Sequence, residues 1–183
     1  QEKKAMLNKM NMVIGAFFSE TGGELLRQLT AFNGKAPELR QILRPETNWT
    51  AEDFRQAVTQ ATALKPELDG LRGDLKGLRT FLLSRQDHLL RLLESPNLLE
   101  HERFTDILWA VLHVSEELAA RDLSQPLPAS DMKHLNGDLK RAFERTTGVW
   151  LDYMRHLQTT YPYLFSLAVR QNPFAEKPSV IVT

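Results

Sequence analysis

The apolar residues of this 183-residue chain recur almost throughout at three- and four-residue steps, the spacing of one face of an α-helix. Proline and glycine divide the pattern into segments, and no segment alternates apolar and polar residues as a half-buried strand does. The sequence therefore predicts an all-α protein, an antiparallel helical bundle of four long helices plus one or two short helices. Folds that depend on a β-sheet are excluded.

The segments between these breaks give the approximate bounds of each helix. The predicted helices cover residues 3–32, 37–43, 50–64, 67–94, 98–121 and 130–171. Thr50 and Ser130 are expected to be N-caps. The pair Gly22-Gly23 predicts a kink or break in the first helix, and Pro162 predicts a kink or restart in the last one. We expect residues 1–172 to form a single helical-bundle domain and residues 173–183 to form an extended tail.

The segment 67–94 carries leucines in alternating three- and four-residue steps, with Arg85 in one slot of the pattern. This is a heptad seam, which predicts one continuous helix packed against its neighbours. Gly70, Gly73 and Gly77 fall inside that seam, where each glycine costs about 1 kcal/mol of helix propensity relative to alanine. We expect close packing of a neighbouring element over these glycines to offset that cost.

Composition narrows the possible functions. Lys+Arg and Asp+Glu both number 23, so the formal net charge is zero, whereas nucleic-acid-binding proteins carry an excess of positive charge. Cysteine is absent, which excludes disulfides, thiolate nucleophiles and cysteine metal sites. No catalytic motif is recognisable, and no cofactor is assigned. The sequence thus favours a non-enzymatic chain that binds a protein partner or associates with itself.

Histidines and carboxylates share helix faces in two places. His113 shares a predicted helix face with Glu116 and Glu117, three and four residues further on. On the last helix, Asp131, His134 and Asp138 repeat that logic at i, i+3 and i+7. If these helices pack antiparallel, the two sets meet, and helical bundles build metal sites from inward-facing Glu and His side chains. The candidate metal ligands are Glu102, Asp106, His113, Glu117, His134 and Asp138. Interhelical hydrogen bonds or a solvated face are the alternative interpretation.

Three functional hypotheses follow from these features. The leading one is a helical interaction or sensory domain that works through its first helix, where Met6, Met10 and Met12 make an adaptable apolar surface. The second is a helical-bundle metalloprotein that uses the histidine and carboxylate residues. The third is a sensor whose apolar pocket between helices is lined by Trp109, Trp150 and Tyr153 and takes a small ligand.

Three stretches carry a resemblance to a known family. Residues 11–20 (NMVIGAFFSE), 97–102 (NLLEHE) and 161–168 (YPYLFSLA) resemble an uncharacterised bacterial membrane-anchored family. In that family a soluble helical domain follows one or two N-terminal transmembrane helices. The resemblance implies a tether to the inner membrane, with the domain on its cytoplasmic face, and implies no activity. Without the tether, we expect a cytoplasmic protein.

Overall fold

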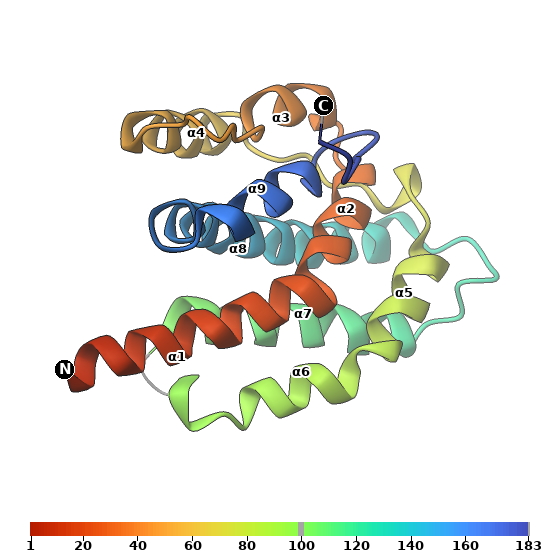
Figure 1. Ribbon diagram of the computed structural model, residues 1–183. Helices are drawn as coiled ribbons and strands as arrows, with labels where there is room; N and C mark the ends of the chain where they lie inside the picture. The colour runs from red at the N-terminus through yellow and green to blue at the C-terminus, as the bar shows by residue number, and fades with distance from the viewer. Residues whose placement is uncertain (99–100, 183) are drawn as a thin grey trace.

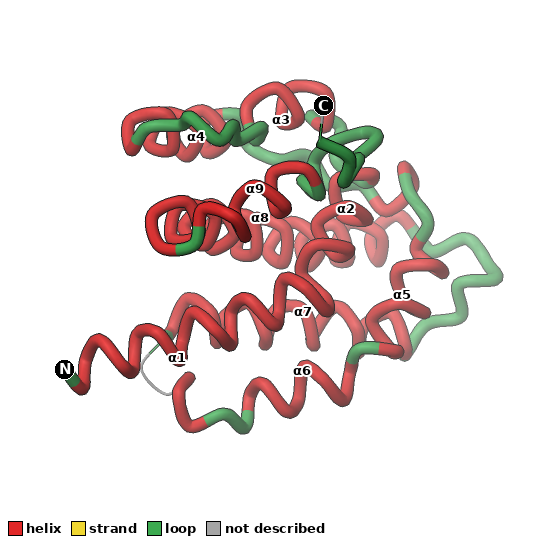
Figure 2. Tube along the Cα trace, viewed as in Figure 1, coloured by secondary structure: helices red, strands yellow, loops and turns green. Residues whose placement is uncertain are grey.

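The structure is a computed structural model that describes residues 1–98 and 101–182. Within these residues every regular element is helical and no strand occurs, so the prediction of an all-α bundle is confirmed (Figure 2). Residues 99 and 100, which belong to the stretch 97–102, and residue 183, the end of the predicted tail, lie outside the described part of the chain.

The helices follow the predicted segments with one exception. Their bounds are α1 Glu2–Phe17, α2 Gly23–Ala31, α3 Ala36–Ile42, α4 Ala51–Ala63, α5 Leu75–Ser84, α6 Gln86–Leu93, α7 Glu102–Ala119, α8 Ala129–Thr160 and α9 Pro162–Arg170. Short 3-10 turns lie at Gly70–Arg72 and Pro96–Leu98. The capping box at the start of α4 is formed by Thr50 and Asp53, as a Thr N-cap predicts.

The centre of the molecule is α7, which packs against α5, α6 and α8 (Figure 1). Its apolar residues are almost fully buried: Phe104, Ile107, Leu108, Val111, Val114 and Leu118. One strip of α7 stays at the surface beside α8. Side chains on this strip are therefore held by two long, well-packed helices while remaining open to solvent.

The glycine pair 22–23 produces a π-helical turn, Phe18–Gly22, between α1 and α2. The wider turn buries two consecutive aromatic side chains on different neighbours. Phe17 meets Phe104 edge-on at 5.3 Å between ring centroids, and Phe18 stacks on Tyr153 at 5.4 Å. A Cβ on Gly22 would lie 2.6 Å from atoms of both phenylalanine rings, so this turn requires glycine.

The single helix predicted over residues 67–94 is wrong. The segment instead contains the 3-10 turn Gly70–Arg72 and the two helices α5 and α6, with Leu71 79% exposed rather than in a seam. Two aspartates cap separate helical segments here. The Asp69 and Asp74 carboxylates accept hydrogen bonds from the N–H groups of Leu71 and Gly77, so the 3-10 turn and α5 each begin afresh. These local hydrogen bonds outcompete the heptad pattern.

Close packing over two of the glycines is confirmed. A Cβ on Gly73 would lie 2.6–2.9 Å from ring atoms of buried Phe32. A Cβ on Gly70 would lie 2.6 Å from the sulfur of Met132, and the Gly70 N–H donates to Asn136 on α8. The glycines thus bring this irregular segment against α8 and the end of α2.

The last two helices form as predicted around Pro162, which starts α9 after α8 ends at Thr160. Ser130 is not the N-cap of α8, because the helix already begins at Ala129 with Pro128 before it. The tail after α9 is anchored at its start. Phe174 is buried against Trp150 at 5.1 Å between ring centroids, and Asn172 donates to the Leu43 carbonyl.

Candidate metal centre

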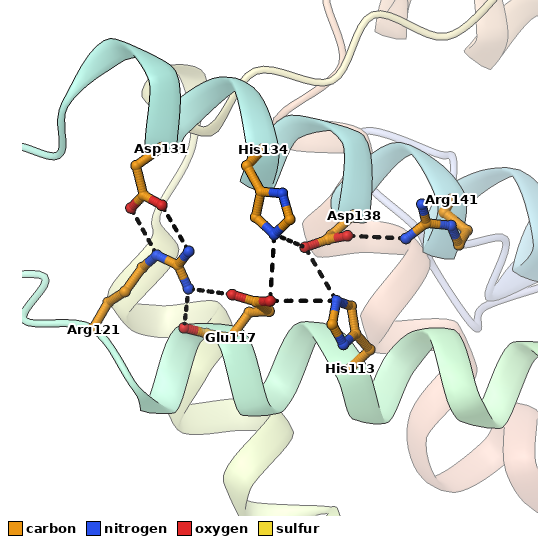
Figure 3. A network of polar contacts seen from close by, with 7 residues as sticks. All are labelled: His113, Glu117, Arg121, Asp131, His134, Asp138 and Arg141. Carbon is orange, nitrogen blue, oxygen red and sulfur yellow. Dashed lines mark hydrogen bonds and ion pairs between the residues drawn. The ribbon is translucent and has the colours of Figure 1, made fainter.

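The exposed strip between α7 and α8 carries both pairs of histidine and carboxylate. The contacts pair His113 with Asp138, Glu117 with His134, and Arg121 with Asp131, so numbers rise along α7 as they fall along α8. The two helices are therefore antiparallel. In this register the two i, i+4 pairs face each other across the interface (Figure 3).

Four ligand atoms converge between the helices. The His113 Nε2 lies 3.4 Å from Glu117 Oε1 and 3.4 Å from Asp138 Oδ2. The His134 Nε2 lies 3.3 Å from the same glutamate oxygen and 3.5 Å from the same aspartate oxygen. All four atoms lie within 4.8 Å of one another. Among the described residues, no other group of three or more His, Asp and Glu side chains meets this condition.

These distances distinguish between two explanations. Charge-assisted N–H···O bonds between imidazole and carboxylate shorten to about 2.7–2.9 Å. In a tetrahedron of nitrogen and oxygen ligands around a zinc ion, with bonds of about 2.0–2.1 Å, neighbouring ligand atoms are separated by roughly 3.3–3.4 Å. Four of the six separations among these atoms, at 3.3–3.5 Å, equal the tetrahedron edge, and the other two, between the two nitrogens and between the two oxygens, do not exceed 4.8 Å. The arrangement therefore suits a shared cation better than a hydrogen-bonded network.

Asp138 supplies a second, independent observation. Its side chain is only 5% exposed, yet its Oδ2 has no hydrogen-bond partner. Leaving a buried acceptor unpaired costs about 1–3 kcal/mol, and more for a charged group. The Asp138 Oδ2 is the oxygen that faces both imidazoles. A cation bound there would satisfy it.

Two arginines hold the outer oxygens of the carboxylates. The Arg141 Nη1 donates to Asp138 Oδ1 at 2.9 Å, and the Arg121 Nη1 donates to Glu117 Oε2. Arg121 is fixed in turn by Asp131, whose two oxygens accept its Nε and Nη2 at 2.8 and 2.7 Å. These contacts orient the carboxylates, as the outer-shell partners of metal ligands do in known metal sites.

The pairing with Arg121 also favours the ionised forms of Glu117 and Asp131. The hydrogen bond from Arg121 lowers the pKa of Glu117 below its usual value, and the contact with His134 lowers it further. The hydrogen bond from Arg121 likewise lowers the pKa of Asp131. With neutral imidazoles, the three carboxylates and two guanidinium groups give a formal charge of −1. A divalent cation is thus electrostatically favoured at this position.

The structure separates the six predicted ligands into two groups. It brings together His113, Glu117, His134 and Asp138. Glu102 and Asp106 lie two to three turns away along α7, where both line a separate surface depression with Leu98 and Thr105. They are exposed and do not reach the cluster, because the α7–α8 register pairs only the later part of α7 with the two α8 ligands.

Arg121 and Arg141 were not predicted as part of this site, and Asp131 was placed on the face of His134 but not among the candidate ligands. The signal was present in part, because Arg121 follows Glu117 by four residues and Arg141 follows Asp138 by three. Those spacings are common on solvated helix faces, so they did not distinguish a site. The ion pair between Arg121 and Asp131 joins the end of α7 to α8, so it depends on the tertiary structure.

Two of the three residues predicted to line an aromatic pocket lie along one groove, and ligand binding there stays a prediction. Trp150 and Tyr153 line a groove of about 630 Å³ together with Phe18 and Leu157. This volume falls within the range of small-molecule pockets. Trp109 does not line it, because its side chain is exposed on α7.

Comparison with known proteins identifies similar sequences. The profile of the family described as "Uncharacterized protein MJ1433, C-terminal helical domain" matches residues 6–170, which include all four cluster residues. Uncharacterized protein MJ1433 of Methanocaldococcus jannaschii is 38% identical over 181 residues, which cover 99% of this chain and 72% of that protein. No solved structure matches the chain significantly.

The resemblance to a bacterial membrane-anchored family is therefore wrong. The matching family is a different one, and its similar member is archaeal. Within residues 1–98 and 101–182, no helix is both long enough and apolar enough to span a membrane. The expected tether and the placement at the inner membrane rested on that resemblance and have no support here.

Proposed function

We propose that this chain, which belongs to the family of MJ1433 C-terminal helical domains, binds one divalent transition-metal ion between α7 and α8. His113, Glu117, His134 and Asp138 are the ligands. Imidazole and carboxylate together suit zinc, iron, manganese and similar ions. The ion would link α7 to α8, whose ligands are separated in the sequence by the loop that connects the two helices.

The observation that carries this proposal is the convergence of four ligand atoms, one of which is a buried carboxylate oxygen without a hydrogen-bond partner. Either feature alone is common on helical proteins. Together they place two imidazole nitrogens and two carboxylate oxygens within 4.8 Å of one another, with Asp138 Oδ2 lacking a hydrogen-bond partner. The formal charge of −1 also favours a divalent ion over an anion or a neutral ligand.

Four protein ligands make a saturated site when the ion is tetrahedral. Catalytic zinc sites typically keep one position for water, whereas structural sites use four protein ligands. The arrangement thus supports a structural or sensing role for the ion, in keeping with a non-enzymatic domain. His113 and His134 are 45% and 55% exposed, so the ion would enter from solvent on the imidazole side.

The test measures metal content and affinity directly. The protein is purified without chelators and analysed by inductively coupled plasma mass spectrometry, and the stripped protein is then titrated with Zn²⁺ by calorimetry. We expect one ion per chain in the wild type and loss of binding in His113→Ala and His134→Ala. His156→Ala is the matched control, since His156 lies on α8 outside the cluster. Absence of binding by the wild type would overturn the proposal.

A second candidate function is self-association through α1, as the hypothesis of a helical interaction domain predicts. Leu7 and Met12 are large apolar residues of α1 that lie at the surface, with Met12 74% exposed. Methionine-rich surfaces adapt well to a partner. Sedimentation equilibrium of the wild type and of Met12→Glu tests this candidate. We expect a dimer that the variant dissociates, and a wild-type monomer at all concentrations would refute it.

A further inference from the structure

We propose that Arg121 and Arg141 determine which metal this site selects, by holding each carboxylate ligand to a single coordinating oxygen. The site then offers four donors and favours a small tetrahedral ion of the zinc class over Mg²⁺, Ca²⁺ or Mn²⁺. This inference rests on the proposed function, because it assigns the specificity of the same site.

In both carboxylate ligands, one oxygen contacts an arginine and the other faces the two imidazoles. In Asp138, Oδ1 accepts the hydrogen bond from Arg141 while Oδ2 faces both imidazoles. In Glu117, Oε2 accepts the hydrogen bond from Arg121 while Oε1 faces both imidazoles. One oxygen of each carboxylate is thus turned toward the centre, and the other is held on its far side (Figure 3).

The two arginines are not equally fixed. The Arg121 side chain is mostly buried and makes four kinds of contact: both oxygens of Asp131, the Glu117 carboxylate and the Glu117 backbone carbonyl. Arg141 is half exposed and is held by Asp138. Arg121 is therefore a rigid part of the site. Arg141 can be replaced with less damage to the fold, which makes it the better residue to vary.

The competing ions differ in the number and type of ligands that they require, and this difference makes a site with one oxygen per carboxylate selective. Zn²⁺ is satisfied by four nitrogen or oxygen ligands in a tetrahedron. Ca²⁺ takes six to eight oxygens and often binds carboxylates through both of them, and Mg²⁺ demands six oxygens in an octahedron. Mn²⁺ also prefers oxygen ligands, so two imidazoles and two one-oxygen carboxylates leave all three of these ions short of oxygen. A carboxylate freed from its arginine could offer its second oxygen and reduce that disadvantage.

The experiment replaces Arg141 with methionine, which keeps an unbranched apolar stem and removes the guanidinium donors. Wild type and Arg141→Met are titrated with Zn²⁺ and Mn²⁺ in competition, and the ratio of the two dissociation constants is measured. Arg145→Met is the matched control, since Arg145 is an exposed arginine of α8 outside the cluster. We expect the preference for Zn²⁺ over Mn²⁺ to fall about tenfold or more in Arg141→Met, and to stay at the wild-type value in the control.

A spectroscopic measurement separates a change in coordination from a general loss of affinity. Co²⁺ bound by four ligands absorbs visible light much more strongly than Co²⁺ bound by six. We expect an intense spectrum for the wild type and a weaker one for Arg141→Met at saturating Co²⁺. Zinc binding with an unchanged metal preference and cobalt spectrum in the variant would overturn this inference alone. Failure of the wild type to bind Zn²⁺ would overturn the proposed function and this inference with it.

Discussion

Replacing Asp138 with asparagine should abolish the stabilisation of this domain by zinc while leaving the metal-free protein close to wild type. The substitution keeps the shape of the side chain and an oxygen that can accept from Arg141. It removes the negative charge from the most buried ligand of the cluster. In the metal-free protein two effects oppose each other. The bond from the half-exposed Arg141 loses its anionic acceptor and weakens by about 1 kcal/mol, and the unpaired carboxylate oxygen disappears, which relieves about 1–3 kcal/mol.

The effect of zinc on the wild type can be worked from linkage. At a free zinc concentration 100 times the dissociation constant, binding stabilises the native state by about 2.7 kcal/mol. In a domain of this size, 1 kcal/mol raises the melting temperature by about 2–4 °C. We therefore expect zinc to raise the wild-type melting temperature by roughly 5–11 °C. In Asp138→Asn the same zinc concentration should raise it by less than about 2 °C, because the weakened site is barely occupied.

The assay is thermal unfolding followed by circular dichroism, with and without zinc. Asp152→Asn is the matched control, since Asp152 is an exposed aspartate of α8 that pairs with Arg103 and not with the cluster. This control should keep the full zinc-dependent shift even if its baseline stability changes. An equal shift in Asp138→Asn and wild type would refute the reasoning, because the stabilisation would then arise elsewhere on the protein.

Three further predictions concern the rest of the site and the packing around it. Glu102→Gln and Asp106→Asn should bind zinc with the wild-type dissociation constant in calorimetry, because both residues lie away from the four converging atoms; a large loss of affinity in either would contradict the assigned ligand set. The folded-state pKa of Glu117 is lowered, so its contribution to stability is present above its usual value of 4.5 and is lost as the pH falls below that value. Urea unfolding between pH 7 and pH 3 should therefore show falling stability on the acid side, with a shallower fall in Arg121→Met; parallel curves would count against the pairing. Gly73→Ala should destabilise the protein by about 1–3 kcal/mol through its clash with Phe32, whereas Gly137→Ala in α8, where a Cβ meets no atom within 4 Å, should stabilise it by about 0.5–1 kcal/mol. Chemical denaturation of the two variants tests both signs, and equal effects would show that packing does not decide them.

Much of the fold follows from local rules that the sequence displays directly. Helical spacing of apolar residues predicted the all-α class, and Thr50 and Pro162 marked real helix starts. The prediction of one helix over residues 67–94 was wrong for a local reason as well. Its leucine spacing indicated one helix, but Asp69 and Asp74 make competing hydrogen bonds to the backbone beside the glycines. Spacing alone does not weigh a capping residue against a heptad.

For the candidate site too, part of the arrangement follows from local sequence and part from the tertiary structure. The sequence alone grouped His113 with Glu116 and Glu117, and His134 with Asp131 and Asp138, because residues at these spacings share a helix face whatever the rest of the chain does. Only the tertiary structure decided that these pairs meet, since the register of α7 against α8 depends on how their buried side chains pack. The same register left Glu102 and Asp106 outside the cluster, buried Asp138 and brought Arg121 to Asp131. Faces of helices are local properties, whereas burial and the meeting of faces are properties of the packed core.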